Sequence, residues 1–234
     1  RYFDKHETDV TVEKRETELR LPPGNRLFVV EGRESELFYY PPEKLLSAQL
    51  LEQLRIPFDS VSAWGLLPRN EVKVGETWIP DTWAQQLVTG VEAVLKSEFE
   101  CTRAKVEQDV ASVTFEGTLE GGRYGGESKL EFTGGYEFAL KEKYIRELHV
   151  TLKDKSTISP VSPGLDIVAK IRFTRKPAQS HPQLTDELLE SIPLDASPIR
   201  LLLHFDSTWG TRFLHTRNWH VIPGKYVILR LIDN

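Results

Sequence analysis

The chain has 234 residues, of which 39% are hydrophobic and 28% charged, as is typical of a globular protein that buries a core. Its net charge of −5 argues against nucleic acid or an anionic membrane as partner, because both favour a basic surface. No apolar run approaches the roughly 18 residues that span a bilayer. The single cysteine, Cys101, excludes an internal disulfide bond and is in phase with apolar neighbours, so we expect a buried thiol.

The first 40 residues predict three strands. Tyr2–Arg20 is charged on both faces, which is typical of an edge strand or of a ribbon that leaves a sheet. After a Pro-Pro-Gly-Asn turn, Arg26–Glu31 and Leu37–Tyr40 are expected to form a hairpin around residues 32–35.

Two amphipathic helices and one motif are expected next. The helices lie near residues 43–54 and 81–89, and Asp81 is the predicted N-cap of the second. Between them, residues 68–78 follow the pattern P-x-x-x-V-x-V-G-E-T-W. Its Val-Lys-Val predicts a short strand, its glycine a turn, and Trp78 a large buried side chain whose indole N–H finds a partner.

This motif resembles one found in uncharacterised exported bacterial proteins of planctomycete type, and the resemblance extends over about residues 1–176. In those proteins the motif precedes a meander of long strands, and it has no known chemistry. The resemblance implies an extracytoplasmic location, in the periplasm or the cell envelope. A start at Arg1 with no methionine anywhere fits a removed export signal, and it fits equally a segment of a longer protein.

Residues 91–174 predict four or five long antiparallel strands, because apolar and polar residues alternate with a period of two. Gly117 and Gly134 fall on the apolar register, where glycine marks a bend or a close approach, so we expect the sheet to curl toward its apolar face. The predicted fold class is mainly β (α+β): a long, curved, half-barrel-like antiparallel sheet with two short helices and a small C-terminal β segment.

Such a sheet, with two helices on its concave side, resembles the half-barrel of LolA/LppX-type lipoprotein carriers. This resemblance concerns the fold alone, and it implies a site for a hydrophobic ligand on the apolar face. The candidate ligand-binding residues are Leu130, Phe132, Tyr136, Phe138, Val150, Ile171 and Phe173. A filled core is the alternative interpretation of the same side chains.

The last third of the chain is expected to hold a structured Pro-rich linker with one short helix over 177–199 and a β segment over 200–234, after a sheet domain over 1–176. Residues 210–221 resemble the opening hairpin of PsbP-like exported domains, which implies that the chain stops inside such a domain.

A histidine cluster in this β segment is the one place where a metal ion is conceivable. Its ligands would be His204, His215, His220 and Asp206. The spacing matches no standard zinc pattern, and on one extended strand His215 and His220 would lie on opposite faces. We therefore expect no metal site and no cofactor.

The sequence favours a non-catalytic envelope protein that binds a hydrophobic small molecule or lipid, or a partner protein. The alternative is a structural or assembly subunit completed by strand addition, suggested by the charged N-terminal strand and the apolar strand 226–232. A metal-dependent hydrolase that uses the histidine cluster is the third hypothesis. No nucleophile motif, isolated carboxylate pair or phosphate loop points to another enzyme.

Overall fold

The computed structural model describes residues 7–12, 15–22, 26–33, 35–42, 46–176, 182–191, 202–206, 210–215, 219–223 and 229–233. The chain divides into two compact units. Residues 1–31, 38–56 and 178–234 form the first unit, and residues 32–37 and 57–177 form the second. The expected division into 1–176, 177–199 and 200–234 stays a prediction.

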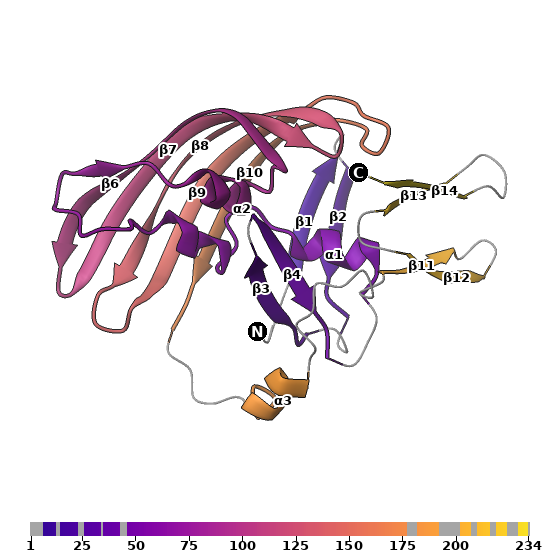
Figure 1. The fold of residues 1–234 in the computed structure, drawn as a ribbon, viewed down its shortest axis with the longest axis horizontal. Coiled ribbons are helices and arrows are strands. Elements are labelled where there is room, and N and C mark those ends of the chain that lie inside the picture. The colour runs from indigo at the N-terminus through magenta and orange to yellow at the C-terminus, as the bar shows by residue number, and fades with distance from the viewer. Residues whose placement is uncertain are drawn as a thin grey trace. The chain divides into compact units, whose positions relative to one another are not determined.

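A six-stranded antiparallel sheet dominates the second unit. Its strands are β5 (Thr77–Trp78), β6 (Ala93–Glu107), β7 (Val110–Arg123), β8 (Gly126–Ala139), β9 (Tyr144–Ser156) and β10 (Leu165–Thr174). They pair in the order β10-β9-β8-β7-β6-β5, and Figure 1 shows the long strands curving together. The predicted mainly β fold with a chain-order meander is therefore confirmed, and no closed barrel forms among the described residues.

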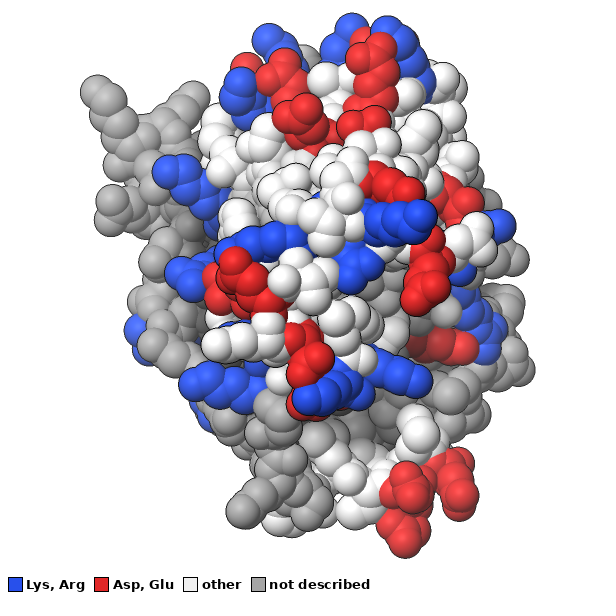
Figure 2. Space-filling model, turned by 90° about the vertical axis from the view of Figure 1, so that its left-hand side faces the viewer, with Lys and Arg blue, Asp and Glu red and all other residues white. Residues whose placement is uncertain are grey.

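Tight turns fix the register of the meander. Gln108 and Asp109 join β6 to β7 with φ angles of 47° and 64°, and Tyr124 and Gly125 join β7 to β8 with φ angles of 54° and 71°. Two consecutive residues with positive φ match the twist of the flanking strands. The pairing that follows puts opposite charges side by side on the outer face, such as Lys153 Nζ and Glu131 Oε2 at 3.0 Å. Both signs are interspersed on the face that Figure 2 shows.

Gly117 in β7 and Gly134 in β8 lie against aromatic rings. Gly117 pairs with Phe132, and Gly134 pairs with Phe115, in neighbouring positions of β7 and β8. A Cβ atom on Gly117 would lie 2.9 Å from the Phe132 ring, and one on Gly134 would lie 2.7 Å from the Phe115 ring. The predicted close approach at both positions is therefore confirmed.

Short helices cover the apolar face of this sheet. The helix α2 (Thr82–Thr89) begins after Asp81 and ends at Gly90, which has a φ of 75°, so both predicted ends are confirmed. A 3-10 helix, Ser62–Leu66, lies over the same core, where Phe58 stacks on Phe115 with ring centroids 5.4 Å apart. The other predicted helix, α1 (Ala48–Leu54), belongs to the first unit.

Four two-stranded antiparallel sheets make up the remaining strands. They are β1 (Glu7–Val12) with β2 (Arg15–Arg20), β3 (Val29–Arg33) with β4 (Glu36–Tyr40), β11 (Leu202–Asp206) with β12 (Thr211–His215), and β13 (Trp219–Pro223) with β14 (Leu229–Asp233). The expectation of one strand over Tyr2–Arg20 was wrong, because the chain reverses after Val12 and the two halves satisfy each other's backbone groups. The predicted hairpin near residues 32–35 is confirmed.

Caps set the start of two helices. The helix α1 begins later than expected, because the Ser47 Oγ accepts a hydrogen bond from the Leu50 N–H at 3.1 Å. Thr185 caps α3 (Asp186–Ser191) by accepting from the Leu188 N–H at 3.2 Å, as predicted.

Within the described residues, no helix has the length and apolar character that a membrane crossing requires.

Candidate functional site: a tryptophan hollow

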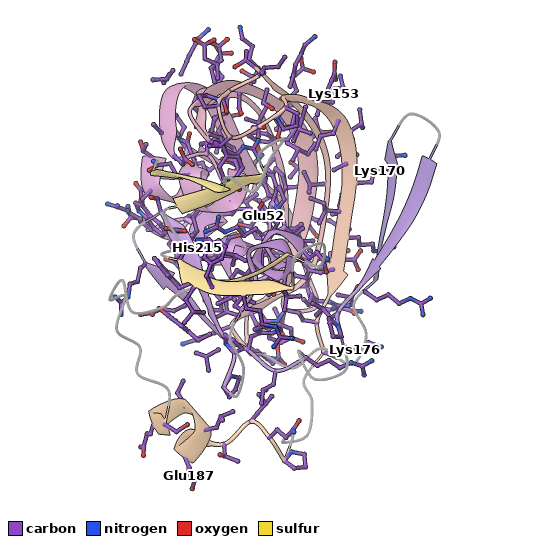
Figure 3. All side chains as sticks on the ribbon, turned by 90° about the vertical axis from the view of Figure 1, so that its right-hand side faces the viewer. Glu52, Lys153, Lys170, Lys176, Glu187 and His215 are labelled. Atoms are coloured by element: carbon purple, nitrogen blue, oxygen red, sulfur yellow. The ribbon has the colours of Figure 1, made fainter. Side chains whose placement is uncertain are left out.

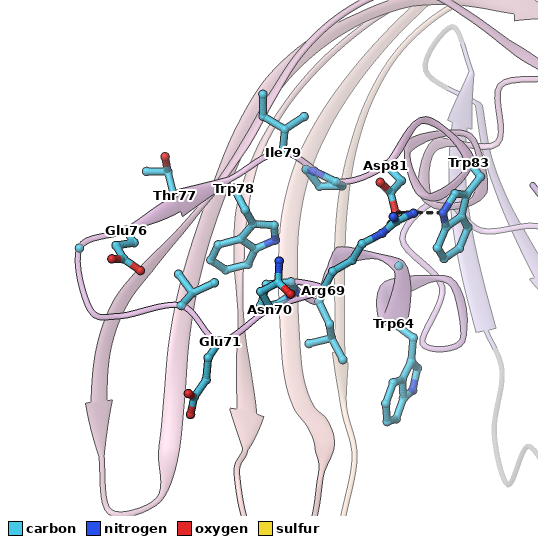
Figure 4. A pocket seen from close by; sticks show the side chains of 16 residues that line it. Trp64, Arg69, Asn70, Glu71, Glu76, Thr77, Trp78, Ile79, Asp81 and Trp83 are labelled. Atoms are coloured by element: carbon cyan, nitrogen blue, oxygen red, sulfur yellow. Dashed lines mark hydrogen bonds and ion pairs between the residues drawn. The ribbon is translucent and has the colours of Figure 1, made fainter.

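An open hollow with a volume of about 670 Å³ lies on the second unit, between the 3-10 helix, the loop that follows it, β5 and the start of α2 (Figure 4). This volume falls in the range of ligand pockets. We call it the tryptophan hollow and define it by its principal lining residues: Trp64, Arg69, Trp78, Ile79, Asp81 and Trp83.

Two indoles of the hollow remain open to solvent. Trp64 on the 3-10 helix is 46% exposed, and Trp83 on α2 is 43% exposed. The two helices that carry them pack closely. A Cβ atom on Gly65 of the 3-10 helix would lie only 2.9 Å from the Ala84 Cβ on α2. Glycine is therefore required at position 65 for the contact between the two helices that carry these tryptophans.

A carboxylate links the loop after the 3-10 helix to the start of α2. Asp81 Oδ2 accepts from Arg69 Nε at 2.7 Å, from Arg69 Nη2 at 2.6 Å and from the Trp83 indole N–H at 3.1 Å (Figure 4). Asp81 is thus the N-cap residue of α2, but its side chain makes no capping hydrogen bond. The carboxylate instead orients the Arg69 guanidinium and the Trp83 ring.

Trp78 forms the floor of the hollow. It is partly buried against the core, and its indole N–H donates to the Leu66 carbonyl at 3.0 Å. The same carbonyl accepts from the Tyr136 hydroxyl at 3.3 Å. The predicted partner for the indole N–H is confirmed, but the ring is only partly buried and also lines an open site.

The strand predicted at Val72–Val74 was wrong. These residues form a loop, and Val74 is 55% exposed. The loop is held by backbone pairing to Arg103, whose carbonyl accepts from the Gly75 N–H at 2.8 Å, and by the Glu76 Oε2, which accepts from the Lys73 N–H at 2.7 Å. Gly75 has a φ of 88°, so the predicted turn there is confirmed. The strand starts only at Thr77.

The seven residues predicted to bind a ligand lie together in the core of the sheet and not in the hollow. Leu130, Phe132, Tyr136 and Val150 each expose 3% or less. The other three, Phe138, Ile171 and Phe173, are partly buried and pack against the same cluster. A ligand on this face would have to displace these side chains.

The histidine cluster falls on three strands. His204 lies in β11, His215 in β12 and His220 in β13, so His215 and His220 belong to different strands. Those two strands pair with different partners. The side chains of His204, Asp206 and His220 lie outside the described ones. Among the side chains that are described, no group of three His, Cys, Asp or Glu could hold a metal ion.

Burial favours the neutral form of two titratable groups of the core. It raises the pKa of Cys101 to about 12, and the charge of Glu100 adds to this effect. It also raises the pKa of Tyr136 above its usual range, with a smaller contribution from Cys101. A neutral buried thiol is a poor nucleophile, which fits the predicted structural role of Cys101.

Sequence reasoning singled out Trp78 and missed the rest of the hollow. The available signal was the clustering of three of the five tryptophans between positions 64 and 83, around Arg69 and Asp81. Comparisons with protein-family models, with curated proteins and with solved structures found no match. The suspected resemblances therefore stay predictions.

Proposed function

We propose that this chain is a binding protein of the cell envelope, and that it holds a segment of a partner protein in the tryptophan hollow. The observation that supports this most strongly is the pair of indoles, Trp64 and Trp83, which stay nearly half exposed on two closely packed helices. Tryptophan and arginine are the residues most enriched at the energetic centres of protein interfaces. The envelope location rests on the motif resemblance alone.

The hollow combines apolar surface with polar groups that are already oriented. Ile79 is 72% exposed and extends the apolar rim. The Arg69 side chain is 75% exposed although Asp81 fixes it, so little side-chain entropy is lost when it meets a partner. This arrangement suits a short segment with one large apolar side chain and a hydrogen-bond acceptor beside it.

A hydrophobic small molecule or lipid on the apolar face of the sheet receives less support. The predicted lining residues contact one another there, and Leu130 exposes only 1% of its surface. Well-packed cores leave few voids for a ligand.

A displayed library of random peptides, selected on the wild-type chain, tests the proposal. Enriched peptides should bind the Trp64→Ala and Trp83→Ala variants at least about tenfold more weakly, the range of an interface hot spot. Leu95→Ala on β6 is the matched control, because Leu95 is also an exposed apolar residue, at 73%. Peptides that bind all variants equally, or a selection without enrichment, would contradict the proposal.

A further inference from the structure

The last strand of the six-stranded sheet has an open edge. Among the described residues, β10 pairs with β9 alone. It is ten residues long and leaves large apolar side chains exposed: Leu165 at 46%, Ile167 at 41% and Val168 at 65%. Long edge strands with exposed apolar residues offer unpaired backbone groups to another strand. This edge lies away from the tryptophan hollow, which borders β5 at the other end of the sheet.

We propose that β10 pairs antiparallel with β10 of a second copy of this chain, around a two-fold axis at Ala169. This register places Asp166 opposite Arg172 of the second copy, and Arg172 opposite its Asp166. Opposite charges that face each other across a strand pair stabilise the pairing. Both side chains lie on the exposed face of β10, at 76% and 69% exposure.

The same register also covers the apolar side of the strand. Ile167 comes to lie opposite Ile171 of the second copy, and Leu165 opposite its Phe173. Ile171 and Phe173 already pack against the core from one side. Pairing would therefore extend the core across the two-fold axis and remove exposed apolar surface from water.

Charge selects this register over its neighbours. An axis at Lys170 would put two ammonium groups opposite each other, which is unfavourable. An axis at Val168 would pair Asp166 with Lys170, but it would overlap only residues 165–171 of the strand and leave Arg172 beyond the pairing. The axis at Ala169 overlaps residues 165–173 and faces Lys170 with Val168. Figure 3 shows Lys170 on the outer side of the strand.

Existing ion pairs are compatible with this arrangement. Asp166 Oδ2 lies 3.6 Å from Lys155 Nζ, and Arg172 Nη2 lies 2.8 Å from Glu147 Oε1. Each charge would then stand between two partners of opposite sign, one on β9 and one on the second copy. Exposed ion pairs of this kind each contribute little, so the apolar contacts and the backbone pairing supply the main driving force for dimerisation.

Cysteine cross-linking tests the register in the full chain. On a two-fold axis, residue 169 faces itself with Cα atoms roughly 4.5–5.5 Å apart, which a disulfide bond can span. Mild oxidation should therefore convert Ala169→Cys to a covalent dimer faster than Val168→Cys or Lys170→Cys. The native Cys101 is buried and does not interfere. Equal rates at the three positions, or fastest cross-linking at 168, would overturn the proposed register.

Reversing the two charges in separate variants tests the pairing. Mixing the two variants then controls for any other effect of either substitution. Asp166→Lys puts two like-charged pairs into its own dimer, and Arg172→Glu does the same with the opposite sign. Each alone should dissociate at least about tenfold more readily than wild type in sedimentation velocity, since each changes two cross-strand pairs. An equimolar mixture restores both pairs and should form a heterodimer. The matched controls, Glu98→Lys and Lys96→Glu on β6, should remain dimeric. A wild-type chain that is monomeric at its highest soluble concentration, or a mixture that does not associate, would overturn the proposal.

Discussion

Glycine at two core positions is required by the rings opposite it. A Cβ on Gly117 would lie 2.6 Å from the Glu98 carbonyl oxygen, and one on Gly134 would lie 2.3 Å from that of His149. Backbone cannot move away as a flexible side chain can, so Gly117→Ala and Gly134→Ala should each lower the free energy of unfolding by roughly 1–3 kcal/mol. Urea denaturation measures this.

Gly122 supplies the control for these substitutions. It lies in the same strand as Gly117, and no atom lies within 4 Å of its hypothetical Cβ. Gly122→Ala should leave stability unchanged or raise it slightly, because alanine restricts the unfolded chain. An equal loss for all three variants would show that the strand needs glycine for another reason.

The Cys101 thiol makes stability depend on alkaline pH. Its folded pKa of about 12 lies above the unfolded value of 9.0, so its contribution is complete below pH 9 and is lost as pH rises toward 12. In this window the unfolded chain has released the proton and the folded chain retains it. Stability should fall by about 1.4 kcal/mol per pH unit from this group.

Chemical denaturation at several pH values checks this slope. Between pH 9 and 10, the free energy of unfolding of Cys101→Ala should fall less steeply than that of wild type, and the onset of tyrosine ionisation is common to both chains. The two slopes are compared, and not the absolute stabilities, because the substitution also removes core volume. Identical slopes would mean that water reaches the thiol in the folded chain.

At the scale of elements, a buried ion pair joins the end of β7 to β9. Arg123 Nη2 contacts Asp154 Oδ2, and the two side chains expose only 16% and 2%. Arg123→Ala would leave a buried carboxylate without its counter-charge, so it should cost about 3–5 kcal/mol of stability. Adding Asp154→Asn should recover part of that loss, because an amide needs no counter-ion. If Arg123→Ala costs less than about 1 kcal/mol in urea unfolding, the pair behaves as a surface pair.

Local sequence pattern predicted the elements whose shape follows from neighbouring residues. The meander follows from a period of two over long strands, and the end of α2 follows from Gly90. The strand at Val72–Val74 failed because hydrogen bonds with Arg103, distant in sequence, hold the segment as a loop: its guanidinium donates to the Val72 carbonyl, and its backbone pairs with Gly75 and Glu76. The single strand over Tyr2–Arg20 failed because no glycine or proline marks the reversal after Val12.

At the scale of the whole molecule, the candidate site escaped prediction because it depends on a carboxylate that would ordinarily cap its helix. Asp81 instead accepts hydrogen bonds from Arg69 and Trp83, and no local sequence pattern predicts these two partners. No local pattern predicts the exposure of Trp64 either, and its side chain is 46% exposed on the 3-10 helix. The apolar face of the sheet, which sequence reasoning favoured as a ligand site, is instead the core of the unit.

The indole N–H resonances of the tryptophans test the central claim most directly. In a heteronuclear NMR titration with a peptide selected on the wild-type chain, the Trp64 and Trp83 signals should shift strongly. The Trp78 signal should shift less, because its N–H is already committed to the Leu66 carbonyl. Shifts confined to Trp209 or Trp219, with Trp64 and Trp83 unchanged under saturating peptide, would contradict a binding site at the tryptophan hollow.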